Sequence, residues 1–241
     1  MVGGAPAVLN ARVAAFAALA ALLAAYYAAS ESLWTASTWW DVALISLVLI
    51  PAVFALVYLV LPLVSARGLF LVALAFAAFA AVTTVAGLDA LANFAKLAAV
   101  TAVAFWLLTY LETLGLVVPV AAIIPFVDAW SVWRGPTHVI VTERKEIFTN
   151  LSFALPVPGR HASANLGLPD LLFFALFLAT CVRFRLRTGW TWLAMTLSFG
   201  VTLALAVWLD IGGLPALPGL SIAFLGVNAD LLWRKLRPAQ V

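Results

Sequence analysis

Long apolar stretches alternate with short polar ones along almost the whole chain. Each stretch is close to the roughly 20 residues that a helix needs to cross hydrocarbon, and none shows the strict alternation of a barrel strand. The pattern predicts about eight membrane-spanning helices, at 7–29, 42–64, 67–87, 91–110, 114–133, 168–184, 189–209 and 216–233. The first of these, at 7–29, is also compatible with a cleaved signal peptide.

One long polar stretch, at 134–167, interrupts this pattern. It suggests a division into four N-terminal helices within 1–113 and a four-helix core within 114–241. Inside the polar stretch, residues 137–142 are largely β-branched and predict a short strand. Residues 156–165 are typical of a loop.

Composition narrows the class of protein. The chain is 66% hydrophobic and 10% charged, whereas soluble domains carry about 25% charged residues. We therefore predict an all-α polytopic membrane protein with the lipid bilayer as its surroundings. A single cysteine, Cys181, excludes a disulfide framework. The basic residues lie at segment ends, so they indicate membrane orientation and not a nucleic-acid site.

The distribution of charge predicts this orientation. With eight spans, eight basic residues lie on the side of the N-terminus and four on the other, which also holds six acids. The positive-inside rule then places both termini in the cytoplasm and the 134–167 loop outside.

Two aspartates flank this loop within apolar segments. Asp128 lies five residues before the predicted end of one span, and Asp170 lies in the first turn of the next. Ionisable groups at membrane depth are costly, and paired carboxylates are suited to acid–base chemistry. The chain returns to this side at 212–219, where two prolines and three glycines predict backbone that is not regular helix.

Each of these features has a simpler interpretation. Asp170 follows Pro169 and could cap a helix, because an acid suits the positive end of the helix dipole. Asp128 could extend its carboxylate to the membrane surface. Lys96, seven residues after Asp89, is expected to snorkel while Asp89 caps the helix. Asp128, Asp170 and the irregular backbone at 212–219 are predicted at one depth in the membrane, and together they favour a functional site.

The order of motifs resembles the presenilin and signal peptide peptidase family of intramembrane aspartyl proteases. Val-Asp at 127–128, a polar loop, Gly-Leu-Pro-Asp-Leu-Leu-Phe-Phe at 167–174 and Leu-Pro-Ala-Leu-Pro at 214–218 follow the order of that family's Tyr-Asp, Gly-x-Gly-Asp and Pro-Ala-Leu motifs. The resemblance covers about residues 120–233. Val127 replaces the family's Tyr, and Pro169 replaces its second Gly.

The resemblance implies a presenilin-like fold and hydrolysis of peptide bonds within transmembrane helices. It implies that Asp128 and Asp170 are the catalytic pair and that six residues shape the site: Gly167, Leu168, Pro169, Pro215, Ala216 and Leu217. The loop outside matches the signal peptide peptidase arrangement, which implies substrates with a cytoplasmic N-terminus.

Other chemistry is disfavoured. The two histidines, His138 and His161, lie in the loop, no HExxH or Gly-x-Ser-x-Gly motif occurs, and no metal or cofactor is expected. Two alternatives stay open. One is a non-catalytic relative that binds transmembrane helices, and the other is a proton-coupled carrier with Asp128, Asp170 and Lys96 as a relay.

Overall fold

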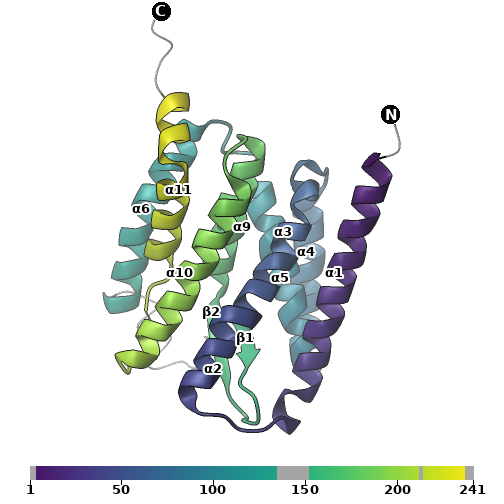
Figure 1. The fold of residues 1–241 in the computed structure, drawn as a ribbon. Coiled ribbons are helices and arrows are strands. Elements are labelled where there is room, and N and C mark those ends of the chain that lie inside the picture. Colours follow the sequence, from purple (N-terminus) through teal and green to yellow (C-terminus); the bar gives the residue numbers. More distant parts are fainter. Residues whose placement is uncertain (1–3, 135–151, 212–213, 237–241) are drawn as a thin grey trace, which may run out of the picture.

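The structure is a computed structural model that describes residues 4–134, 152–211 and 214–236. Long helices run side by side and enclose a small β-hairpin (Figure 1). The start of α1 and the end of α11 lie at the same end of this bundle. The main elements are α1 (Gly4–Ala29), α2 (Thr38–Leu44), α3 (Ile50–Leu59), α4 (Leu69–Val85), α5 (Asp89–Leu107), α6 (Leu114–Arg134), β1 (Ser152–Pro156), β2 (Ser163–Gly167), α9 (Leu168–Arg183), α10 (Thr188–Trp208) and α11 (Leu217–Leu236).

The prediction of a helical membrane protein is confirmed. Among the described residues, five helical segments are long and apolar enough to cross a membrane: Leu9–Ser32, Thr38–Ser65, Asp89–Leu107, Leu114–Arg134 and Thr188–Trp208. Helices also occupy the other three predicted ranges. Of these, α4 is apolar but has 17 residues, and α9 has 16.

The second helical segment is not regular. Its residues Ile45–Leu49 form a π-helical turn directly before Pro51, and Pro62 lies in a 3₁₀ turn at Leu61–Ser65. Proline lacks an N–H and clashes with the carbonyl four residues earlier, so the chain widens where it approaches Pro51. The tight connection to α4 closes at Gly68, whose φ of 75° suits a residue without a side chain.

Helix α9 lies at the centre of the hydrophobic core. It packs against α5, α10 and α11. Two of its side chains, Phe174 and Phe177, are fully buried. Phe174 stacks on Phe54 of α3, and Phe177 stacks on Phe224 of α11 with ring centroids 4.7 Å apart. The predicted N-terminal and C-terminal groups of helices therefore share one core.

The predicted loop at 156–165 is the turn of a two-stranded antiparallel hairpin together with the strand residues on either side of it. Strands β1 and β2 pair with Ser152 opposite Gly167 and Pro156 opposite Ser163. Phe153 and Leu155 are fully buried among the helices. The loop prediction holds for residues 157–162 and is wrong for Pro156 and residues 163–165, which are strand. These short strands, one of them ending in proline, are stabilised by contacts with distant helices. The predicted strand at 137–142 lies outside the described residues.

Polar side chains of α1 and α5 contact this hairpin. The Lys96 ammonium donates to the carbonyl of Ser152 at 3.2 Å. The predicted extension of Lys96 to the membrane surface is therefore not seen, because its ammonium binds a backbone carbonyl of the hairpin. Asp89 does begin α5 and is exposed, but Leu88 is the N-cap residue and no side-chain hydrogen bond caps the helix.

The turn of the hairpin docks onto the connection between α1 and α2. The Gly159 N–H donates to the Ser30 carbonyl at 2.8 Å, and Arg160 lies 3.5 Å from Asp41. His161 contacts Glu31 at 3.0 Å. These contacts fix the far end of the hairpin.

Gly159→Ala is expected to release this turn and lower the free energy of unfolding by more than about 2 kcal/mol. Gly159 has a φ of 65°, and an added Cβ would lie 2.6 Å from the Leu33 carbonyl oxygen. Left-handed backbone costs other residues roughly 1–2 kcal/mol, and the clash adds to that. Urea unfolding in detergent measures the loss. Gly68→Ala is the control, since it has a φ of 75° and no atom within 4 Å. Equal losses in both variants would contradict the contact.

A buried polar cluster joins three helices nearer the end that holds the termini. Asn228 of α11 donates to the Thr191 hydroxyl of α10 at 2.8 Å, and Cys181 of α9 lies 3.5 Å from the same hydroxyl. Near it, Asp230 forms a bidentate pair with Arg187 at 2.8 Å.

Candidate functional site

Asp170 lies in the first turn of α9, directly after the hairpin. Gly167 ends β2 and caps α9, and its backbone N–H hydrogen-bonds to the Asp170 carboxylate. A Cβ on Gly167 would lie 2.9 Å from Oδ2 of Asp170. Only glycine therefore allows the carboxylate to sit where it does. This bond is also the one that a capping acid makes, so it does not distinguish the two interpretations of Asp170.

Asp128 is held at the start of another helix. It lies in the last two turns of α6, and its Oδ2 accepts a hydrogen bond from the Leu217 N–H at 3.1 Å. Leu217 is the first residue of α11, which packs along α6. A carboxylate from one helix thus satisfies a free N–H at the end of another.

The two carboxylates lie close enough to interact. Asp170 experiences the charge of Asp128, and both residues are partly buried. Each also occupies the N-terminal end of a helix, α9 for Asp170 and α11 for Asp128. The positive ends of two helix dipoles therefore converge on one pair of acids, which offsets part of their mutual repulsion.

The residues that depart from the family motifs fit without strain. Pro169 occupies the first turn of α9, where an N–H would have no helical partner, so its ring costs no hydrogen bond. Leu168 beside it is partly buried. Val127 is 52% exposed on the surface of α6.

The backbone that leads into α11 is irregular over fewer residues than predicted. Irregular structure ends at Ala216, so Pro218 and Gly219 are helical. Proline is tolerated in a first helical turn, which explains the difference. Pro215 and Ala216 do lie in non-helical backbone, and Ala216 and Leu217 are buried.

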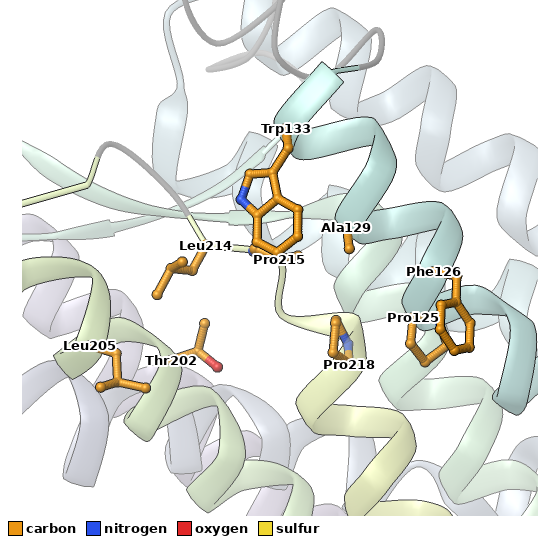
Figure 2. Close-up of a pocket in the computed structure, with 9 residues that line it drawn as sticks. All are labelled: Pro125, Phe126, Ala129, Trp133, Thr202, Leu205, Leu214, Pro215 and Pro218. Carbon is orange, nitrogen blue, oxygen red and sulfur yellow. The ribbon is translucent and has the colours of Figure 1, made fainter. Parts of the chain in front are cut away.

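A cavity of about 400 Å³ lies beside this backbone. Figure 2 shows it bounded by α6, with Ala129 and Trp133, and by α10, with Thr202 and Leu205, while Pro215 lies between them. Its lining is almost entirely apolar. Neither aspartate lines it, but Asp128 adjoins Ala129 in the chain and bonds to the residue two positions after Pro215.

Several residues of the site were not identified from the sequence. They are the cavity residues Trp133 and Thr202 and the hairpin contact Asn93, while Lys96 was identified but not its partner. Asn93 and Lys96 are three residues apart in α5 and so share a face, a signal that pointed to a common partner. Lys96 contacts the hairpin, not the aspartates, in the described structure. His138 and the loop residues 135–151 lie outside the described residues.

No group of three or more His, Cys, Asp or Glu side chains that could hold a metal gathers in the described part of the chain. Comparisons with known protein families, with curated proteins and with solved structures found no match to this chain. What the site does must therefore be argued from its own residues.

Proposed function

We propose that this protein is an intramembrane aspartyl protease in which Asp128 and Asp170 act as a pair. One observation carries the proposal: two aspartates from different helices interact, and each is held by a backbone N–H at the start of a helix. Interacting carboxylates do not readily ionise together, so the proposed pair shares one proton. This is the state that acid–base hydrolysis requires.

The reaction follows from that state. The ionised carboxylate accepts a proton from water as the water oxygen attacks the scissile carbonyl carbon, while the protonated carboxylate donates to the carbonyl oxygen. In the tetrahedral intermediate the C–N bond then breaks, and the leaving nitrogen takes a proton from the pair. No covalent intermediate forms. The helix N-termini beside the pair stabilise the negative charge that develops.

The substrate is a transmembrane helix that unwinds locally, because a helical peptide bond is shielded from attack. The unwound segment exposes polar backbone groups that need partners in a dry environment. The sheet in the described part of the chain has two strands, β1 and β2. The edge of β2 that faces away from β1 is therefore not paired with a third described strand, and β2 leads directly into the turn that carries Asp170. An extended substrate adds to this edge, and its apolar side chains fit the cavity between α6 and α10.

The eight-span arrangement is part of this proposal. Helix α9 rises about 24 Å, less than a bilayer core of about 30 Å. The five residues of β2 add about 16 Å, which completes the crossing. The hairpin therefore enters the membrane, and Asp170 lies well inside it. The charge distribution supports cytoplasmic termini and a site that opens toward the other face.

Cleavage of a single-span test peptide by the purified protein in bilayer nanodiscs tests the proposal. Peptides of both orientations are needed, and the products are identified by mass spectrometry. We expect cleavage within the span that a hydroxyl-containing transition-state mimic of aspartyl proteases blocks. Tight binding of the peptide without cleavage would instead support a helix-binding protein. Peptide-independent proton flux would support a carrier.

Leu217→Pro is expected to lower kcat about 10-fold or more relative to Leu217→Ala. Both variants lose the buried leucine side chain, but the proline also removes the N–H that binds Asp128. Hydrogen bonds to charged groups contribute about 1.5–3 kcal/mol, which corresponds to roughly 10- to 100-fold in rate if the geometry of the pair depends on them. Equal kcat values in the two variants would show that the Leu217 N–H does not position Asp128 for the reaction.

A further inference from the structure

The outer edge of β1 carries backbone groups that the hairpin itself does not pair. In an antiparallel pair, alternate residues direct their N–H and C=O toward the partner strand. The Ala154 N–H bonds to Asn93, so the outward residues of β1 are Ser152, Ala154 and Pro156. In an apolar bundle such groups need other partners.

Four side chains provide those partners. Lys96 donates to the Ser152 carbonyl at 3.2 Å, and Asn93 accepts from the Ala154 N–H at 3.2 Å. Tyr27 donates to the Ala154 carbonyl, and Tyr26 donates to the Pro156 carbonyl at 2.6 Å. All three outward carbonyls of the strand are therefore satisfied. Pro156 has no N–H, so at this position the outer edge of β1 offers no donor that needs a partner.

These four residues come from two helices and form one surface. Tyr26 and Tyr27 lie in the last turn of α1, and Asn93 and Lys96 lie on one face of α5. The Tyr27 ring also packs against Phe94 and Phe153. We call Tyr26, Tyr27, Asn93 and Lys96 the edge clamp. Helices α1 and α5 contact each other and are held in the bundle by α3 and α9.

We propose that the edge clamp fixes the hairpin in one register and thereby determines which peptide bond of a bound substrate reaches Asp170. This inference rests on the proposed protease function. The clamp contacts β1, β1 fixes β2, and β2 continues through Gly167 into the turn that carries Asp170. A strand can slip along such partners only in steps of two residues, because a one-residue slip turns every side chain to the opposite face. The clamp residues are thus positioning residues.

The test uses Tyr27→Phe, which removes one hydroxyl, and Lys96→Met, which keeps the alkyl stem and removes the ammonium. The control is Thr191→Val, which removes a buried hydroxyl from the cluster with Asn228 and Cys181, away from the hairpin. Two quantities are measured on the full-length protein in nanodiscs: hydrogen exchange at the amide of Ala154, and the masses of the cleavage products.

We expect exchange at Ala154 to increase at least 10-fold in both clamp variants and not in the control. We also expect new products displaced by two residues, with the total rate less affected. Unchanged exchange at Ala154 in both clamp variants would show that the edge clamp does not fix the hairpin. Faster exchange with the original products would overturn its role in choosing the bond. If the wild type cleaves nothing, the protease function fails, while hydrogen exchange still decides whether these residues fix the hairpin.

Discussion

Asp128→Asn and Asp170→Asn are each expected to abolish detectable cleavage and to leave the fold intact. Asparagine keeps the side-chain oxygen that accepts from the Leu217 or Gly167 N–H, so the helix contacts persist. What is lost is the proton that the pair shares. General acid–base catalysis contributes about 10²- to 10⁴-fold per group, and residues that act as a unit are not additive. The double variant should therefore be no slower than either single one.

The measurement is kcat on the test peptide, with thermal unfolding in detergent as the check on folding. Asp89→Asn is the matched control, because Asp89 is an exposed acid at the start of α5. It should retain wild-type activity. Cleavage that persists in either asparagine variant would rule out the two-aspartate mechanism.

Gly167→Ala is expected to lower kcat about 100-fold with little loss of stability. The added Cβ would lie 2.9 Å from Oδ2 of Asp170, closer than real contacts allow, so the carboxylate must move. A displacement of about 1 Å at a reacting group costs roughly 10²-fold in rate. The backbone of Gly167 has a φ of −60°, which alanine adopts freely, so the effect is not one of backbone strain.

Gly226→Ala provides the comparison for this variant. Gly226 lies in α11 with no atom within 4 Å of an added Cβ, and alanine favours helix there. It should be as active as the wild type and slightly more stable. If Gly167→Ala also behaves this way, Asp170 does not need its present position, and the catalytic assignment loses its geometric basis.

The candidate site could be located from the sequence because its signals are local. Apolar periodicity located the helices, and charge inside apolar segments singled out Asp128 and Asp170. The contact between Asp128 and Leu217 follows from two antiparallel helices that end at the same level. Pro218 was misjudged because proline disrupts a helix in its interior but not in its first turn.

The hairpin was not predictable in the same way. Its strands, Ser-Phe-Ala-Leu-Pro and Ser-Ala-Asn-Leu-Gly, contain few β-branched residues and have weak strand propensity. They form strands because side chains 56 to 130 residues away satisfy one edge. Such partners leave no periodic signal in the hairpin itself. Lys96 was misjudged for the same reason, since its partner is a backbone carbonyl that no side-chain pattern reveals.

The Lys96 contact also bears on how the protein is made. Lys96 precedes its partner Ser152 by 56 residues, so α5 leaves the ribosome and meets the translocon before the hairpin exists. A lysine near the middle of an inserting helix costs about 2.5–3.5 kcal/mol. Helix α5 is therefore expected to insert before the partner of its lysine exists. The contacts of the N-terminal half are thus complete only after residues 152–156 have been synthesised.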